Sequence, residues 1–217
     1  MATTKPSKAK LIQWGIIALI GSALGACGDV LLLYNPDVSY LTGDYSFMVD
    51  ISPVRLVCGS FLGVLFIPLV LFGLWQVYQL IYERHPGIAK LGFGIAIYFC
   101  CIGVVVHAMF GAMGLAIKQE NFLYLNYLRL LLDTFSGLSV LLHVLVSAIF
   151  SMAIFRKPSS LPIWMVYCNP VSIYIALAST YLFFPPLGSI LAPAAFNLSY
   201  FVYFGCSTWV IYRQNEA

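Results

Sequence analysis

Charged residues are scarce in this chain: Asp, Glu, Lys and Arg make up 9% of its 217 residues. Soluble domains carry about 25%, and a soluble fold could not hide the 61% of residues that are hydrophobic. The composition therefore predicts a polytopic membrane protein. The net charge of +3 is small, and no basic patch with interleaved aromatic residues lies outside the apolar stretches. Nucleic acid is therefore not an expected partner.

The sequence also lacks the motifs of several familiar chemistries: a Cys-x-x-Cys pair, a Gly-rich phosphate loop, a nucleophile elbow and an intramembrane lysine. All six cysteines lie in apolar runs, as expected for free thiols that pack as small hydrophobes. Asp29, His107 and Asp133 could together hold zinc with one open position. None of them belongs to a paired motif such as His-x-x-x-His, so we predict no metal and no cofactor.

What the chain does contain is long apolar stretches, and a helix needs about 20 such residues to cross a bilayer. The sequence predicts an all-α bundle of six transmembrane helices that forms a single domain over residues 1–217. The expected helices span about 11–34, 53–79, 90–117, 123–154, 161–184 and 191–212. Pro53 suits the first turn of the second helix, and Pro68 predicts a kink within it.

The first apolar run follows three lysines and could be mistaken for a secretory signal. Leu24-Gly25-Ala26-Cys27 even resembles a lipoprotein cleavage site, which would leave Cys27 acylated. The run continues to Tyr34, whereas a signal core has about 7–15 residues. We therefore expect an uncleaved first helix, and the acylation of Cys27 stays open.

The basic residues predict the orientation of the bundle. If the helices alternate, the side that carries both termini has eight basic residues and the other side has Arg55 and Lys118. This bias predicts cytoplasmic termini in a multi-pass protein of the cell membrane, with lipids as its surroundings. The four tryptophans near the cytoplasmic ends fit an interfacial belt: Trp14, Trp75, Trp164 and Trp209.

Five polar residues from four helices are expected in the outer half of the membrane: Asp29, His107, Arg129, Asp133 and Asn197. At about 1.5 Å per residue, their depths below the outer helix ends range from roughly 8 to 16 Å. Ionisable groups inside a membrane are costly and mark functional sites by default. We therefore predict that these residues gather around a polar cavity that opens to the outer side.

The fourth expected helix carries Arg129, Asp133, Ser136, His143 and Ser147 on one face, because their spacings are 4, 3, 7 and 4. Arg129 and Asp133 could simply neutralise each other as an i,i+4 pair. Alternatively, the whole face lines a wet cavity, and the continuation of the stripe to His143 favours this interpretation.

Three helices combine a row of glycines with one polar residue: Gly21, Gly25 and Asp29; Arg55, Gly59 and Gly63; Gly103, His107 and Gly111. Such rows let another helix backbone approach closely. His107 could then donate one structural hydrogen bond, or act as an acid, a base or a metal ligand. Arg55 could bind a ligand, although snorkelling to the outer surface is the simpler explanation.

Asn169 precedes Pro170, and the proline leaves a backbone carbonyl near residue 166 without its donor. Asn169 could satisfy that carbonyl, or it could meet His143 as part of an inner binding site.

Three segments suggest a family: the run from Gly28 to Tyr34, the start of the second helix from Arg55 to Leu69, and His107 to Gly111. They resemble an uncharacterised family of small bacterial six-helix integral membrane proteins, a domain of unknown function. The resemblance covers most of the chain. It implies that Asp29, Arg55 and His107 belong to one shared design, and it implies no activity.

The leading hypothesis is a membrane-embedded enzyme that acts on a lipid or another hydrophobic small molecule. Asp29 and Asp133 would be the carboxylates and His107 the proton-transferring group, while Arg129 would bind an anionic headgroup or hold Asp133 ionised. The alternatives are a small-solute or proton-coupled transporter, with His143 and Asn169 as an inner gate, and a sensor or scaffold whose polar contacts are structural.

Overall fold

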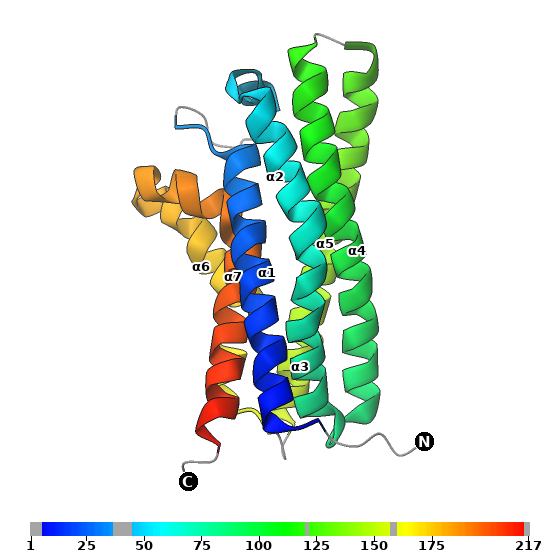
Figure 1. Cartoon of the computed structure of the whole chain (residues 1–217), viewed down its shortest axis with the longest axis vertical. Helices are drawn as coiled ribbons and strands as arrows, with labels where there is room; N and C mark the ends of the chain where they lie inside the picture. Colours follow the sequence, from blue (N-terminus) through cyan, green and yellow to red (C-terminus); the bar gives the residue numbers. More distant parts are fainter. Residues whose placement is uncertain (1–5, 37–44, 120–121, 157–159, 215–217) are drawn as a thin grey trace.

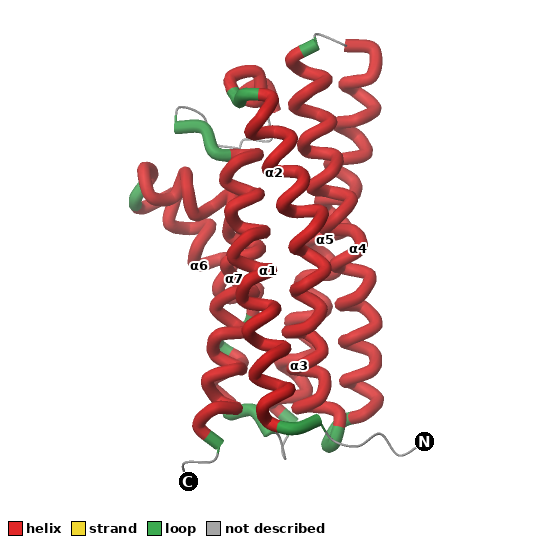
Figure 2. Tube along the Cα trace, viewed as in Figure 1, coloured by secondary structure: helices red, strands yellow, loops and turns green. Residues whose placement is uncertain are grey.

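In the computed structural model, which describes residues 6–36, 45–119, 122–156 and 160–214, every regular element is a helix (Figures 1 and 2). The elements follow in the order α1 (Lys8–Leu33), η2 (Tyr45–Asp50), α2 (Pro53–Phe66), η3 (Ile67–Leu69), α3 (Val70–Tyr82), α4 (Pro86–Lys118), α5 (Phe122–Phe155), η4 (Ile163–Val166), α6 (Pro170–Phe183) and α7 (Pro185–Arg213). The chain is thus all-α, as predicted.

Five helical segments among the described residues are long and apolar enough to cross a membrane: Lys8–Leu33, Pro53–Tyr82, Pro86–Lys118, Tyr124–Phe155 and Pro185–Arg213. The second of these contains α2, η3 and α3, so the 3-10 turn of η3 interrupts one span at Pro68, where the sequence predicts a kink. The Ser52 side chain caps the start of α2, directly before Pro53.

The structure does not form the single long helix that the sequence predicts over 161–184. The chain forms the 3-10 turn η4 and then starts α6 at Pro170, so α6 has only 14 residues. Asn169 is its N-cap, because the Asn169 side chain accepts hydrogen bonds from two backbone N–H groups of the first turn. A 14-residue helix is about 21 Å long, which is shorter than the hydrocarbon core of a bilayer.

The helices form an elongated bundle with both termini at the same end (Figure 1). The paired ends of α4 and α5 rise above the other helices at the far end, while α6 and the first turns of α7 lean out to one side. Pro193 lies within α7, where it removes a backbone donor from the helix.

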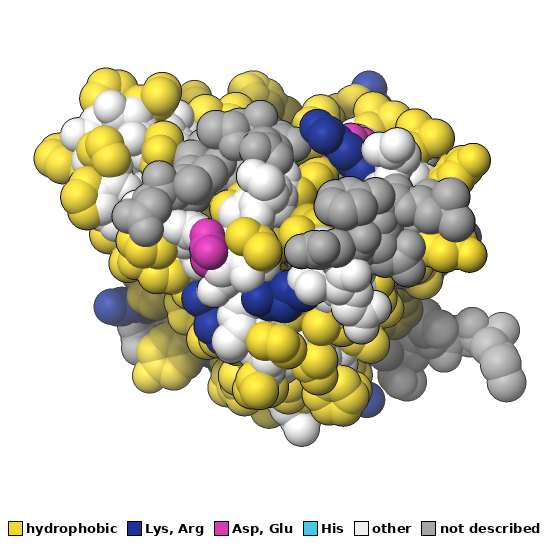
Figure 3. All heavy atoms as spheres, turned by 90° about the horizontal axis from the view of Figure 1, so that it is seen from above, with side chains coloured by type: hydrophobic (Ala, Val, Ile, Leu, Met, Phe, Trp, Pro, Cys, Tyr) yellow, Lys and Arg dark blue, Asp and Glu magenta, His cyan; other side chains and the backbone are white. Residues whose placement is uncertain are grey.

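The end that carries the termini has the expected aromatic girdle. Trp14 packs against Trp75, and Trp164 packs against Trp209. Arg213 lies over the ring of Trp209. The opposite end, seen from above in Figure 3, has many hydrophobic side chains around its rim and few charged ones. Large apolar side chains on the outside of the bundle match a lipid surrounding.

Candidate functional site

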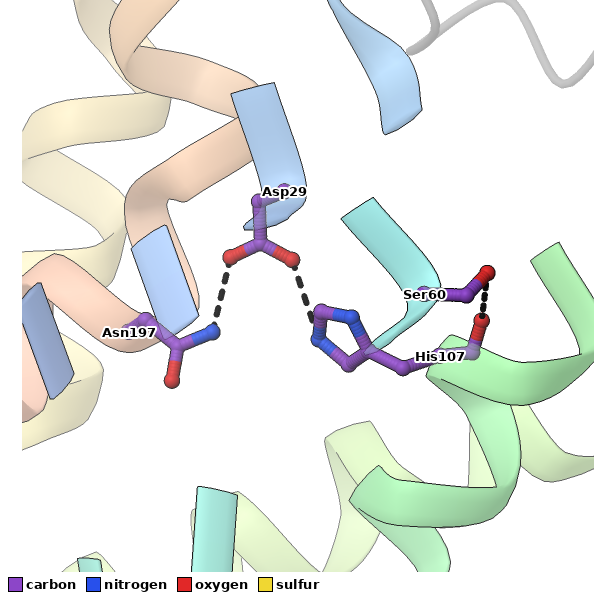
Figure 4. Close-up of polar contacts among 4 residues, drawn as sticks. All are labelled: Asp29, Ser60, His107 and Asn197. Carbon is purple, nitrogen blue, oxygen red and sulfur yellow. Dashed lines mark hydrogen bonds and ion pairs between the residues drawn. The ribbon is translucent and has the colours of Figure 1, made fainter. Parts of the chain in front are cut away.

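The Asp29 carboxylate joins three helices inside the bundle (Figure 4). Its Oδ1 lies 3.1 Å from Nε2 of His107 on α4, and its Oδ2 accepts a 2.8 Å hydrogen bond from Nδ2 of Asn197 on α7. All three residues are buried. The structure thus brings together three of the five residues that sequence depth places in the outer half, and we call them the Asp29 cluster.

Glycines make room for this cluster. A Cβ atom at Gly25 would lie 2.7 Å from the Asn197 amide oxygen, and a Cβ atom at Gly63 would overlap the His107 ring. Gly28 and Gly59 bring the backbones of α1 and α2 into direct contact. The small-residue rows of the two helices therefore serve close helix packing, which carries Asp29 and His107 to within reach of each other.

The two ring nitrogens of His107 have different surroundings. Nε2 faces Asp29, whereas Nδ1 packs toward Gly63 and has no hydrogen-bond partner within the described part of the chain. An imidazolium would leave a charged N–H unsatisfied there, which costs more than leaving a neutral nitrogen bare. We therefore assign the neutral tautomer in which Nε2–H donates to Asp29.

A cavity of about 300 Å³ adjoins the Asp29 cluster, with walls from α1, η2, α4, α5, α6 and α7 and from the η3–α3 junction. Most of its walls are apolar or aromatic, and Asp29, His107 and Asn197 supply a polar patch. The lining residues are Asp29, Leu33, Tyr45, Ile67, Val70, Phe99, Gly103, Val106, His107, Phe110, Ser136, Ser139, Val140, Tyr174, Pro193, Phe196, Asn197 and Tyr200. An apolar pocket with a few convergent polar groups is typical of a small-molecule site.

Arg129 and Asp133 do not line this cavity. Both are exposed on α5, with Arg129 Nε 3.8 Å from Asp133 Oδ2. The other carboxylate oxygen accepts a 2.9 Å hydrogen bond from the hydroxyl of Tyr45, which does line the cavity. Partial burial and this bond to Asp133 raise the pKa of Tyr45 to about 12. Tyr45 is therefore a neutral hydroxyl on the cavity wall.

Arg55 binds the end of α1. Its guanidinium donates to the backbone carbonyls of Val30, at 3.3 Å, and Tyr34, at 2.8 Å. A cation at a helix C-terminus satisfies orphan carbonyls and complements the helix dipole. Arg55 thus fixes the turn that follows Asp29, and it lies outside the cavity lining.

His143 lies behind the aromatic wall of the cavity. It is buried, its Nδ1 lies 3.2 Å from the hydroxyl of Tyr200, and Phe99, Tyr174 and Phe196 pack around its ring. The stripe expected on α5 is therefore divided: Ser136 reaches the cavity, His143 supports its wall, and the Arg129–Asp133 pair is exposed.

Asn169 satisfies the backbone at the start of α6. Its Nδ2 donates a 2.6 Å hydrogen bond to the carbonyl of Val166, and its Oδ1 accepts from the N–H groups of Val171 and Ser172. Asn169 thus makes the backbone contact that one of the two alternatives expects, and it lies outside the cavity lining.

Replacing Asn169 by alanine is expected to destabilise the protein by about 1 kcal/mol, the usual effect of losing an N-cap side chain. The contacts of the Asp29 cluster should persist, because the cluster does not contact Asn169. Thermal unfolding in detergent measures the loss of stability. A loss of less than about 0.3 kcal/mol would show that the Asn169 side chain does not cap α6.

Sequence reasoning missed a second buried polar cluster near the termini. Gln76 is fully buried, and its Nε2 donates to the carbonyl of Leu11 and to the Thr208 hydroxyl. The Ser207 hydroxyl donates to Oε1 of Gln76. Ser60, which donates to the carbonyl of His107, was also missed. An uncharged amide or hydroxyl in an apolar run gives little signal, because helix-internal bonds can satisfy it.

Among the described residues, no three His, Cys, Asp or Glu side chains come together in a way that could hold a metal ion. Long apolar helices around a cavity with a buried carboxylate–imidazole pair are the architecture of a helical membrane protein. The chain belongs to a family of unknown function, DUF6796, whose model matches residues 3–214. This confirms the resemblance to an uncharacterised family. Neither the curated proteins nor the solved structures contain a match.

Proposed function

We propose that this protein binds a lipid or another hydrophobic small molecule in the cavity and exchanges a proton with it at the Asp29–His107 pair. The observation that carries the proposal is the 3.1 Å contact between carboxylate and imidazole on the wall of an otherwise mainly apolar cavity. A carboxylate inside a membrane helix costs about 2.5–3.5 kcal/mol. A purely apolar contact would hold the helices together without that cost.

The geometry supports different roles for the two residues. Nδ1 of His107 is packed against α2, and its Nε2–H donates to Asp29. A ligand proton is therefore exchanged with the Asp29 carboxylate, and His107 positions and stabilises that carboxylate through its hydrogen bond. Asn197 holds the second carboxylate oxygen in place. Asp133 lies outside the cavity and orients the hydroxyl of Tyr45 on the cavity wall. Arg129 also lies outside the cavity.

The proposal includes a topology of six crossings in the cell membrane, with both termini in the cytoplasm. Both termini lie at one end of the bundle (Figure 1), so the chain crosses an even number of times. Five helical segments of the described chain are long enough to span, and α6 then supplies the sixth, shorter passage. The excess of basic residues at the end that carries the termini supports its cytoplasmic placement.

Proton exchange with the ligand can be tested without knowing the ligand in advance. The protein is purified in mild detergent, its co-purified small molecules are extracted after incubation in D2O, and their masses are followed over time. If the site performs acid–base chemistry on carbon, the bound molecule gains deuterium or is converted to a product. A His107→Ala variant with confirmed folding should lose this change, and an unchanged rate would refute the assignment.

The alternative is a proton-coupled transporter, and one observation favours it. Tyr200 lines the cavity, and its hydroxyl lies within hydrogen-bond distance of His143. This contact continues the row of polar groups toward the end of the bundle that carries the termini. Cysteine placed at Ser147, one turn further along α5, discriminates the two in a background without native cysteines. Modification by a membrane-impermeant reagent from the cytoplasm favours transport, and protection favours a one-sided pocket.

A further inference from the structure

In the described chain, the cavity wall contains a carboxyl group, that of Asp29, and no Lys or Arg side chain that would balance it. Arg55 is bound to backbone carbonyls of α1. The two side chains that contact Asp29 are a neutral imidazole and an amide, and they donate N–H groups without adding a charge. A ligand that carries a positive charge would neutralise this wall.

Aromatic rings on the cavity wall provide a second feature, besides the carboxylate, that favours a cation. Six of them line the cavity in three contacting pairs: Tyr45 with Phe110, Phe99 with Tyr200, and Tyr174 with Phe196. Their ring centroids lie 4.6 to 5.9 Å apart within each pair. Aromatic rings attract ammonium groups through the charge distribution of their faces, most strongly where water is excluded.

Building on the proposed function, we infer that the ligand of this cavity is an organic ammonium ion with an apolar body. The Asp29 carboxylate would neutralise the ammonium group, and the rings of Tyr174 and Phe196 would contact the carbon atoms around the nitrogen. The volume of about 300 Å³ is at the small end of ligand pockets, so it fits the ammonium head and the first part of the apolar body.

The ammonium group could belong to a free lipophilic amine or to the headgroup of a lipid, where a phosphate accompanies it. Phosphate groups are usually bound by Arg or Lys, and the described cavity lining contains neither. The lining therefore favours a free amine over a zwitterionic headgroup. A matched set of amphiphiles with one chain length can distinguish the two sources.

The test uses the full-length protein in lipid nanodiscs with tritiated dodecyltrimethylammonium as the probe. Competitors are dodecylphosphocholine, dodecanol and dodecyl sulfate. We expect saturable binding that an excess of dodecanol or dodecyl sulfate does not displace. Weak competition by dodecylphosphocholine would identify a free amine as the source, and strong competition would identify a lipid headgroup; both support the ammonium site.

Variants distinguish binding of the probe in the cavity from its partitioning into the lipid of the nanodisc. Asp29→Asn should weaken probe binding by about tenfold or more, which corresponds to at least about 1.4 kcal/mol. Phe196→Leu should weaken it about three- to tenfold, and Asp50→Asn, which removes an exposed carboxylate outside the cavity, should leave it unchanged. Equal binding of dodecanol, or full binding by Asp29→Asn, would overturn the ammonium site. Absence of binding by every amphiphile would instead contradict the proposed function.

Discussion

Replacing Gly63 by alanine is expected to destabilise the protein by about 1–3 kcal/mol and to separate His107 from Asp29. The added methyl group would overlap the imidazole ring of His107, and overpacking in a tight interior costs about this much. We expect the ring to shift away from the added methyl group and to lengthen its contact with the carboxylate. Thermal or chemical unfolding of the purified variant measures the first effect, and loss of deuterium exchange into the bound molecule measures the second.

Gly94 provides the matched control. It lies within α4, the same helix as His107, and a Cβ atom there would meet no described atom within 4 Å. Gly94→Ala should therefore be neutral, or stabilising by up to about 1 kcal/mol, because alanine favours helix more than glycine does. Equal stability changes in the two variants would show that Gly63 is not packed against His107.

Replacing Asp29 by asparagine is expected to reduce proton exchange with the ligand by about 100-fold or more, the usual contribution of a positioned acid or base. Asparagine keeps the size of the side chain and one acceptor oxygen, so the helices should still assemble. The rate of deuterium exchange into the co-purified molecule measures the effect, and size-exclusion chromatography with circular dichroism verifies the fold.

Asp133→Asn discriminates the observed site from the larger one that sequence analysis predicts. Asp133 is exposed and bonds to Tyr45, so we expect this variant to retain most of the exchange. A loss as large as that of Asp29→Asn would mean that both carboxylates act on the ligand. An unchanged rate in Asp29→Asn would leave the cluster with a structural role, as in a sensor or scaffold.

Different features of the sequence predict the helical fold and the partners of Asp29. Long apolar runs and proline positions determine where helices begin and bend, as Pro53 and Pro68 illustrate. Depth along a helix follows from residue number, which is why Asp29, His107 and Asn197 can be grouped from sequence. The glycine rows that accompany Asp29, Arg55 and His107 indicate which helices approach each other closely.

Depth alone fails where the direction of a side chain matters. Arg129 and Asp133 are near Asp29 in expected depth, but both side chains are exposed on α5, and Asp133 reaches only Tyr45 of the cavity wall. The short α6 was also missed, although Asn169 followed by Pro170 is a typical N-cap with proline at the first helical position. The uninterrupted apolar composition masked that signal.

The proposed function requires that the cavity beside the Asp29 cluster holds a ligand. Native mass spectrometry of the protein released from mild detergent tests it, with Gly103→Phe and Gly94→Phe as paired variants. Gly103 lines the cavity, and a Cβ atom there has ordinary contact with Ile67, at 3.4 Å; Gly94 faces open space on the same helix. We predict that the wild type and Gly94→Phe carry a bound molecule of the same mass and that Gly103→Phe does not. Equal occupancy in all three proteins, or no bound molecule in the wild type, would contradict the proposed function.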